Sequence, residues 1–106
     1  MVPNFYDQLN LKNDRRTVAA GGPCNWQEGD ARAEVKDVTV TQGSVTGSCG
    51  TASTTVRKGT DTDWWLEVNS ANQFTRAPAQ ARAVAVVTRM DGTTYEYPWP
   101  DNVQLH

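Results

Sequence analysis

The stretch that decides the fold runs from Ala79 to Trp99 and reads AQARAVAVVTRMDGTTYEYPW. Asp91-Gly92 stands between two runs that are rich in β-forming residues. This dipeptide is a strong hairpin signal, because Gly adopts a positive φ without steric cost and Asp tolerates it. The sequence therefore predicts a long antiparallel hairpin over residues 79–99.

The second arm of this hairpin carries three aromatic residues in alternation, Tyr95, Tyr97 and Trp99. Alternate residues of a strand share one face, so we expect the three rings to line the interior. A two-residue turn would set Tyr95 opposite Thr88. A three-residue loop would set the aromatics opposite smaller residues, Val87, Ala85 and Ala83. Both registers are open, because a slip by one residue exchanges the two faces of a strand.

The rest of the chain consists of short β-rich segments between turn signals, without helical periodicity. In residues 31–40 the apolar positions shift from odd to even at Lys36-Asp37, which predicts a β-bulge or a bend. Residues 1–16 predict an irregular N-terminal arm, and residues 17–106 a single β-rich domain. We expect an all-β fold of about six to seven mostly antiparallel strands, a small β-sandwich with a closed β-barrel as the alternative.

Composition limits the classes of function. The chain has 106 residues, of which 38% are hydrophobic, which is enough for one domain with one core. Its net charge of −2 lacks the basic footprint of a nucleic-acid-binding protein. No run approaches the roughly 18 apolar residues of a membrane span. We therefore expect neither a nucleic-acid partner nor a membrane span.

The two cysteines bear on the compartment. Cys24 and Cys49 each lie among Gly, Ser or Pro residues, as disulfide partners at loop ends often do. A disulfide between them would place the protein outside the cytoplasm, as a secreted mature fragment. Two unpaired thiols are the alternative, and they fit a cytoplasmic protein. The N-terminal residues have no signal-peptide character, which fits either location.

Catalysis has little support in the sequence. The single histidine is His106, at the end of the chain, and neither cysteine has another imidazole to activate it. No serine lies in a Gly-x-Ser-x-Gly elbow. Nothing in the sequence brings two carboxylates to a glycosidase spacing. We expect a protein that is not an enzyme and that uses no cofactor.

One loop offers a weak metal-binding pattern. Asp61 and Asp63 supply two carboxylates that a low-affinity Ca²⁺ site could use. The loop lacks the Gly and the distal Glu of a calcium-hand loop, so turn chemistry is the favoured role of these residues. No Cys/His cluster suggests zinc.

The aromatic residues carry the strongest functional signal. The chain has four Trp and three Tyr. Alternation groups Trp64 with Leu66 and Val68 and turns Trp65 to the other face, beside Glu67. An exposed Trp can stack on a sugar ring, a base or an apolar knob of a partner. The alternative is that Trp65 faces the second half of a sandwich. Together with Trp65, four polar residues nearby are candidates for contacts with a ligand: Glu67, Asn69, Asn72 and Gln73.

These observations favour a non-catalytic binding module outside the cytoplasm, with carbohydrate as the first candidate ligand and a protein partner as the other. One alternative is a structural or assembly protein that joins its neighbours through sheet edges and the N-terminal arm. Another is a secreted inhibitor that presents a disulfide-braced loop such as residues 43–50.

Overall fold

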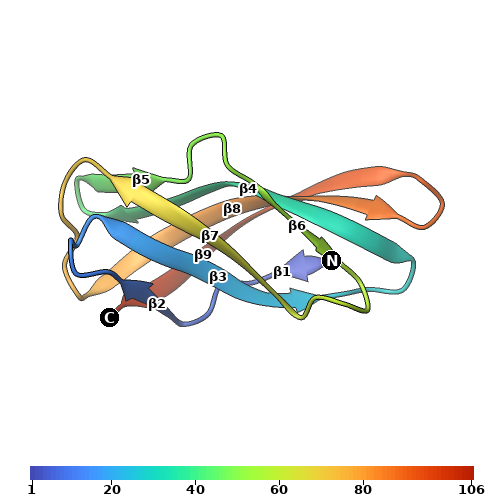
Figure 1. Ribbon diagram of the computed structural model, residues 1–106, viewed down its shortest axis with the longest axis horizontal. Coiled ribbons are helices and arrows are strands. Elements are labelled where there is room, and N and C mark those ends of the chain that lie inside the picture. The colour runs from blue at the N-terminus through green and yellow to red at the C-terminus, as the bar shows by residue number, and fades with distance from the viewer.

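The chain forms a closed β-barrel of seven strands with two short additional strands, seen here in a computed structural model that describes residues 1–106 (Figure 1). The structure contains no helix, and therefore no helix that is long and apolar enough to cross a membrane. The strands are β1 Val2–Pro3, β2 Gln8–Leu11, β3 Thr17–Asn25, β4 Asp30–Gln42, β5 Val45–Ser48, β6 Thr54–Arg57, β7 Asp63–Ser70, β8 Pro78–Arg89 and β9 Thr94–Leu105.

Hydrogen bonding around the barrel follows the order β3-β2-β9-β8-β4-β5-β7, and the β3–β7 pairing closes the ring. All pairs are antiparallel except β2–β9, in which Gln8 lies opposite Gln104 and Leu9 opposite Leu105. β1 pairs with the end of β3, and β6 pairs with the first half of β4. The prediction of an all-β fold is confirmed, and of the two architectures it named, the structure has the barrel.

The β8–β9 hairpin has the register of the three-residue loop. Val87 lies opposite Tyr95, and Ala83 opposite Trp99. The amide of Arg89 donates to the carbonyl of Thr93 (2.8 Å), and Gly92 has a φ of 87°. A type I turn followed by a left-handed glycine gives this arrangement. The tip of the hairpin extends beyond the barrel, which helps to explain the elongated shape of 43 × 21 × 19 Å (Figure 1).

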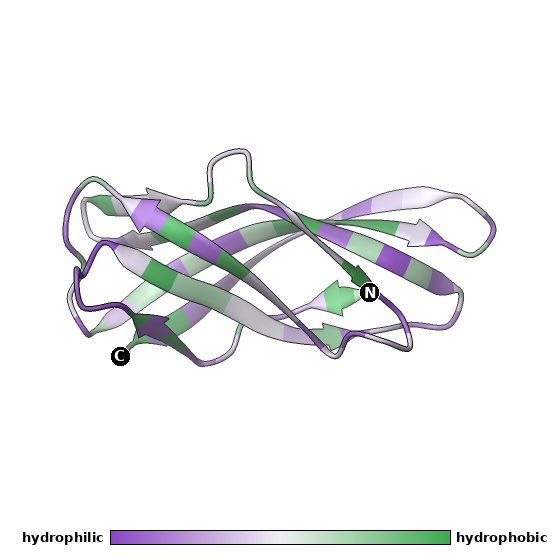
Figure 2. Cartoon of the chain, in the orientation of Figure 1, coloured by the Kyte–Doolittle hydropathy of each residue, from purple (hydrophilic) through white to green (hydrophobic).

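The apolar residues form one core inside the barrel. Alternation along the strands places them there, and Figure 2 shows it as alternating hydrophilic and hydrophobic bands, most clearly along β4. β8 contributes small residues to the interior, Ala79, Ala81, Ala83, Ala85 and Val87. Small residues on β8 leave room for large rings from other strands, as the narrow interior of a small barrel requires.

The N-terminal arm covers a gap in the wall. β9 pairs with β2 only at its last residues, so its outer edge is unpaired from Thr94 to Pro100. The arm runs along β3 at this place, and the amide of Tyr6 donates to the carbonyl of Gly21 (2.9 Å). The side chain of Phe5 points from the arm into the core, where its ring centroid lies 5.2 Å from that of Trp64 and 5.6 Å from that of Trp99. Residues 1–16 thus contribute two strands and part of the core.

A buried ion pair fixes the start of the arm. The α-amine of Met1 donates to the carboxylate of Asp30 and to the hydroxyl of Tyr95 (2.7 Å). Burial opposes ionisation of Asp30, but hydrogen bonds from this amine and from the Gln27 amide outweigh it and hold its pKa below the usual value. Met1 and Asp30 are both buried. Oδ1 of Asp30 also lies 3.6 Å from Nη1 of Arg89, whereas Asp30 is the only ion-pair partner of the Met1 amine.

The expectation that the three aromatic rings of β9 line the interior is met in part, and the expected bulge in β4 is present. Trp99 is buried and Tyr95 half-buried, but Tyr97 is 37% exposed, although its partner Ala85 is buried. Tyr97 lies on the unpaired edge of β9, where no neighbouring strand covers its ring. The predicted bulge is confirmed: the β4–β8 register shifts between Lys36 and Thr39.

The predicted disulfide between Cys24 and Cys49 is wrong, and both thiols are free. The amide of Cys24 donates to the carbonyl of Thr62, just before β7, whereas Ser48 pairs with Asn69 near the other end of β7. Seven residues of strand span about 23 Å. A disulfide needs Cα atoms within about 7 Å, so the topology separates the two cysteines too far for a bond.

Candidate functional site

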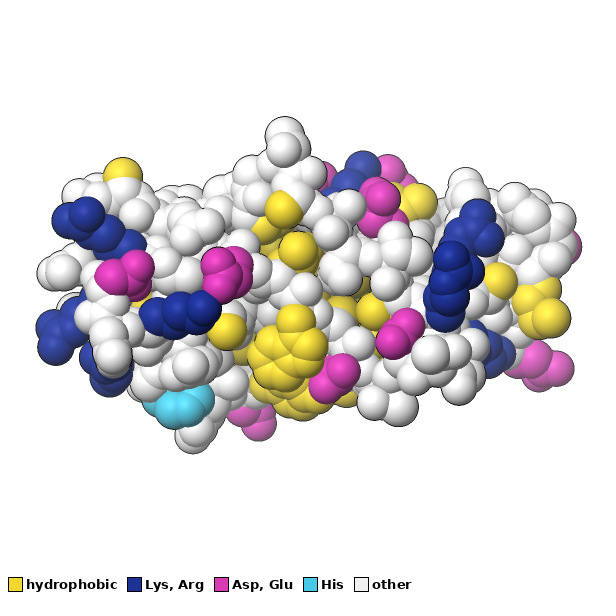
Figure 3. All heavy atoms as spheres, in the orientation of Figure 1, with side chains coloured by type: hydrophobic (Ala, Val, Ile, Leu, Met, Phe, Trp, Pro, Cys, Tyr) yellow, Lys and Arg dark blue, Asp and Glu magenta, His cyan; other side chains and the backbone are white.

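Trp65 is the main exposed aromatic residue of the barrel wall. It lies on the outer face of β7 with 51% of its surface exposed, whereas its neighbour Trp64 is buried at 1%. Alternation along the strand explains the difference, since consecutive side chains point to opposite faces. Val68 is buried with Trp64, and Leu66 is half-buried, as the sequence predicted. The space-filling view shows a hydrophobic patch in the middle of this wall, over β3 and β7 (Figure 3).

The indole ring of Trp65 lies against its neighbours on two sides. In the β3–β7 pair, Trp65 faces Gly21, and a Cβ built at Gly21 would lie 2.3 Å from Cε3 of the ring. The ring therefore covers the backbone of β3, where only a glycine leaves it room. Beyond β3, the ring of Tyr6 approaches the indole with a centroid distance of 5.5 Å and an interplanar angle of 32°. One strand and one ring thus hold the indole in place.

Charged groups border this aromatic pair. Glu67 follows Trp65 on the outer face of β7, and its Oε2 accepts a hydrogen bond from Nζ of Lys12 at 2.6 Å. The hydrogen bond from Lys12 to Glu67, and then the charge of Glu67, raise the pKa of Lys12. On the other side, the Tyr6 hydroxyl donates to Oδ2 of Asp63 (3.4 Å). Partial burial, and then the charge of Asp63, raise the pKa of Tyr6. The aromatic pair thus lies between hydrogen-bonding groups.

A small hollow adjoins the indole. It is an open, shallow hollow of about 180 Å³, lined by Trp65, Leu66, Glu67, Ala19 and Ala20. Four of these five residues are apolar, and the carboxylate of Glu67 stands among them. We refer to Tyr6, Lys12, Trp65, Glu67 and this hollow together as the Trp65 face.

The structure brings together some of the predicted site residues. Trp65, Glu67 and Asn69 form one row along the outer face of β7. Oδ1 of Asn69 accepts a hydrogen bond from the Thr17 hydroxyl (3.2 Å). Asn72 and Gln73 lie farther on, in the loop after β7, where Nε2 of Gln73 donates to the carbonyl of Asp14 (3.4 Å).

Sequence reasoning missed Tyr6, Lys12 and Ala19. Tyr6 had a signal, because a residue next to a buried aromatic such as Phe5 turns outward in an extended segment. Lys12 and Ala19 had none, since only the pairing of distant strands brings them to the indole.

The carboxylates of the weak Ca²⁺ candidate have separate roles. Oδ2 of Asp61 accepts the amide hydrogen of Arg57 (2.7 Å) and so braces its own turn. Asp63 instead faces the Tyr6 hydroxyl. No three or more side chains of His, Cys, Asp or Glu come together as metal ligands anywhere in the chain.

The Trp65 face thus combines an exposed aromatic ring with charged hydrogen-bonding groups. Comparison with known proteins adds no assignment: no protein-family model matches the chain, and no curated protein matches its sequence.

Proposed function

We propose that the protein is a non-catalytic binding module that recognises carbohydrate by stacking a sugar ring on Trp65. The observation that carries this proposal is the indole itself, which is half-exposed and held between Gly21 and Tyr6. An exposed indole offers a flat apolar face with a polar edge, which suits stacking of a sugar ring. Because the ring is already supported, a ligand loses little binding energy in ordering it.

The groups around the indole suit a neutral ligand that is rich in hydroxyl groups. The carbon-bound hydrogens on one face of a sugar ring pack on the indole, while its hydroxyls donate to Glu67 and accept from Lys12. The ion pair between Glu67 and Lys12 leaves little net charge at this place. Because the charges of Lys12 and Glu67 nearly cancel, neither a cation nor an anion gains much net attraction here, and a neutral sugar loses nothing by lacking a charge.

The spacing of the carboxylates supports binding rather than hydrolysis. Asp63 and Glu67 are four residues apart on the same face of β7, which corresponds to about 13 Å along a strand. Glycosidases hold their two carboxyl groups about 5–10 Å apart. Glu67 is also paired with Lys12, which favours its ionised form over the protonated form that a general acid needs.

The contacts of the N-terminal arm weigh against the assembly alternative. Phe5 and Leu9 are buried in the core of their own barrel, so the arm is engaged within the chain. Pro98 and Pro100 lie on the unpaired edge of β9, where prolines discourage the addition of a further strand. An inhibitor loop at residues 43–50 would lack the disulfide that was expected to brace it.

The proposal places the module outside the cytoplasm, where structural polysaccharides are found. With both cysteines free, this part of the proposal rests on the ligand class alone. Detection of the protein in the culture medium or on the cell surface of its source would support it, and detection in the cytosol alone would contradict it.

Tryptophan fluorescence with a panel of short oligosaccharides tests the proposal. Trp65 is the only one of the four tryptophans that is more than half exposed, so a ligand on the indole changes its emission selectively. Trp65→Ala should abolish the response and weaken binding by about 10-fold or more. Met90→Ala, which removes the other strongly exposed large apolar side chain, is the matched control and should bind normally. Equal binding by Trp65→Ala and the wild type would overturn the proposal.

A further inference from the structure

A second series of hollows lies on a different wall of the barrel. Four of them follow one another along the outer face of β8, with volumes of about 200, 420, 250 and 450 Å³. Neighbouring hollows share residues or lie beside alternate residues of the same strand. In order, the β8 residues that line them are Val86 and Thr88, then Arg82 and Val84, then Gln80 and Arg82, and finally Pro78 and Gln80. We call this series the β8 groove.

The groove runs along nearly the whole length of β8. From Thr88 to Pro78 it follows eleven residues of β8, which correspond to about 33 Å of extended chain. β4 and β9 form the two sides at the hollows of about 420 and 450 Å³. The hollow of about 250 Å³ has only β9 beside β8, and the one of about 200 Å³ has β4 and Thr55 of β6 instead of β9. A groove of this length suits an extended polymer better than a compact ligand.

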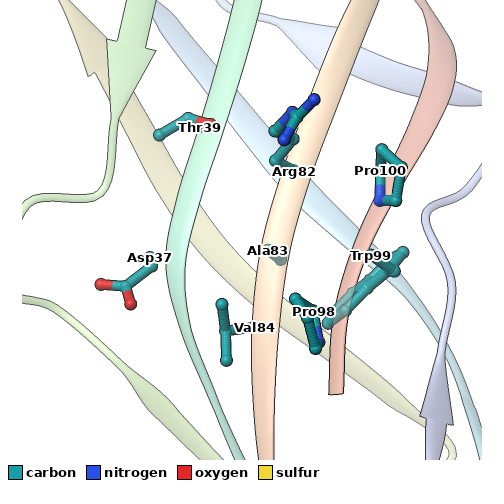
Figure 4. A pocket seen from close by; sticks show the side chains of 8 residues that line it. All are labelled: Asp37, Thr39, Arg82, Ala83, Val84, Pro98, Trp99 and Pro100. Carbon is teal, nitrogen blue, oxygen red and sulfur yellow. The ribbon is translucent and has the colours of Figure 1, made fainter. Parts of the chain in front are cut away.

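Local irregularities shape the central hollow, which Figure 4 shows from close by. On β4, the bulge places Asp37 at the rim, with a φ of 54°. On β9, the flat rings of Pro98 and Pro100 lie opposite Val84 and Arg82. A bulge re-aims a side chain, and proline rings present a flat apolar surface.

The polar groups of the groove have few partners within the chain. Neither the guanidinium of Arg82 nor the carboxylate of Asp37 makes a hydrogen bond or an ion pair. The side chains of Thr39, Gln80 and Asn102 also lack intramolecular hydrogen bonds. The groove thus offers a hydroxyl, two amides and charges of both signs, with patches of proline and valine between them.

These side chains fit a polysaccharide better than an extended peptide. A peptide that binds in extended form usually adds as a strand, through a free sheet edge. β8 has no free edge, because β4 pairs along one side of it and β9 along the other. Sugar hydroxyls, in contrast, hydrogen-bond to side-chain amides, carboxylates and guanidinium groups alike. The flat apolar patches suit the faces of sugar rings.

The groove and the Trp65 face point in opposite directions. In the ring β3-β2-β9-β8-β4-β5-β7, β8 lies three strands from β3 and three from β7. It is therefore diametrically opposite the β3–β7 pair that carries Trp65. A single polymer chain on one wall leaves the other wall free.

We propose that the β8 groove is a second binding site, for an extended neutral polysaccharide, and that one barrel bridges two polysaccharide chains. The bridging depends on the function proposed for the Trp65 face; the groove site does not. Arg82 and Gln80 are the groups that bind the polymer at the centre of the groove. The two sites act together only on a polymer, because a short oligosaccharide occupies one wall.

The test measures binding and cross-linking separately. A panel of soluble neutral polysaccharides is tested for binding by gel retardation and for cross-linking by light scattering, with the protein shown to be monomeric by sedimentation. Arg82→Ala combined with Gln80→Ala removes the groove contacts, and Trp65→Ala removes the opposite face. Arg16→Ala is the charge-matched control, since Arg16 is exposed and lines none of the four hollows.

Each outcome decides one of the two proposals. Wild type and Arg16→Ala should bind and cross-link, whereas the groove double variant and Trp65→Ala should each still bind, at least about 10-fold more weakly, without cross-linking. A groove double variant that cross-links like wild type overturns the groove and leaves the Trp65 face standing. If Trp65→Ala changes nothing and the groove variant loses all binding, the function proposed for Trp65 fails and the groove site stands. No binding to any member of the panel overturns both.

Discussion

The indole of Trp65 lies across the backbone of Gly21, so closely that a Cβ at position 21 would be 2.3 Å from Cε3 of the ring and 2.6 Å from the carbonyl oxygen of Trp64. Gly21→Ala should therefore displace the indole and strain the β3–β7 pair. We expect a loss of stability of about 1–3 kcal/mol, as for overpacking elsewhere, and a shift of the Trp65 emission.

A double-mutant cycle checks the cause of this loss. In a Trp65→Ala background the ring is gone and only the contact with the carbonyl remains, so Gly21→Ala should cost less than it does in the wild type. Chemical denaturation of the four proteins gives the coupling. If Gly21→Ala costs the same free energy of unfolding in both backgrounds, the loss does not come from contact with the Trp65 ring.

Phe5 should be a main stabilising residue of the N-terminal arm. It is buried, and its ring contacts Trp64 and Trp99. Phe5→Ala leaves a cavity between two tryptophans and should cost about 3–5 kcal/mol in the free energy of unfolding. Asn4→Ala is the control on the same segment, because the Asn4 side chain is exposed and its main-chain carbonyl still accepts from Nε1 of Trp64. A similar loss in both variants would contradict the role given to Phe5.

The hairpin tip offers a test of backbone conformation alone. Gly92 has a φ of 87°, and a Cβ there would meet no atom within 4 Å. Gly92→Ala should cost about 1 kcal/mol from the left-handed conformation, while Gly92→Asn should cost less because Asn tolerates it. Thermal unfolding of the two variants gives the comparison. An Ala variant as stable as wild type would mean that the loop adopts another turn.

The sequence predicts the features that neighbouring residues determine, and it does not predict those that depend on residues far apart in the chain. Asp91-Gly92 correctly predicted the hairpin. The alternation of side-chain direction along the strand correctly predicted that Trp64 is buried and Trp65 exposed. These signals are local: a turn needs a particular φ, and a strand has two faces. The choice between the two hairpin registers was not local, because the residues on either side of the turn suit both pairings.

No local feature of the sequence indicates that the sheet closes into a barrel. Closure depends on short segments such as β2, of which Asn10 and Leu11 pair with β3 and the first two residues pair with β9. The same topology sets Cys24 and Cys49 at opposite ends of β7, which spacing along the chain could not reveal. The companions of Trp65 were hidden for this reason too, since Tyr6 and Lys12 lie more than 50 residues from it in sequence.

Acid should destabilise the fold below about pH 4. Hydrogen bonds from the Arg16 amide, and then from Thr17, hold the pKa of Asp14 below its usual value, and those from Thr93 do the same for Asp91. A carboxyl whose pKa is lower in the folded state stabilises the fold above its unfolded pKa, near 4, and loses this effect as the pH falls through the folded pKa.

Calorimetry between pH 7 and pH 2 measures this loss. Asp14→Asn and Asp91→Asn should each flatten the decline of Tm below pH 4, because one titrating group is removed. A decline as steep as in the wild type would rule out these two residues as its source.

The free cysteines should react slowly. Burial, and then the charges of Asp63 and Asp61, raise the pKa of Cys24 to about 11, and Cys49 is buried. Since the thiolate is the reactive form, alkylation of the native protein at pH 8 should be slow, and that of Cys24 should accelerate as the pH rises toward 10. Unfolded protein should take up two alkyl groups without reductant. Mass spectrometry counts the groups, and two unreactive sulfurs in the unfolded protein would reveal a disulfide.

The parallel contact between β2 and β9 has a consequence for how the chain acquires its form. It joins Leu9 to Leu105, so the two segments that complete the wall are separated by nearly the whole polypeptide. Bringing such remote segments together costs loop-closure entropy before any contact between them stabilises the fold. Proteins that depend on such pairings fold in milliseconds to seconds rather than microseconds. During synthesis, the barrel therefore cannot close through β9 until residue 105 has left the ribosome, and until then the apolar residues of β3 to β8 lack this part of their cover.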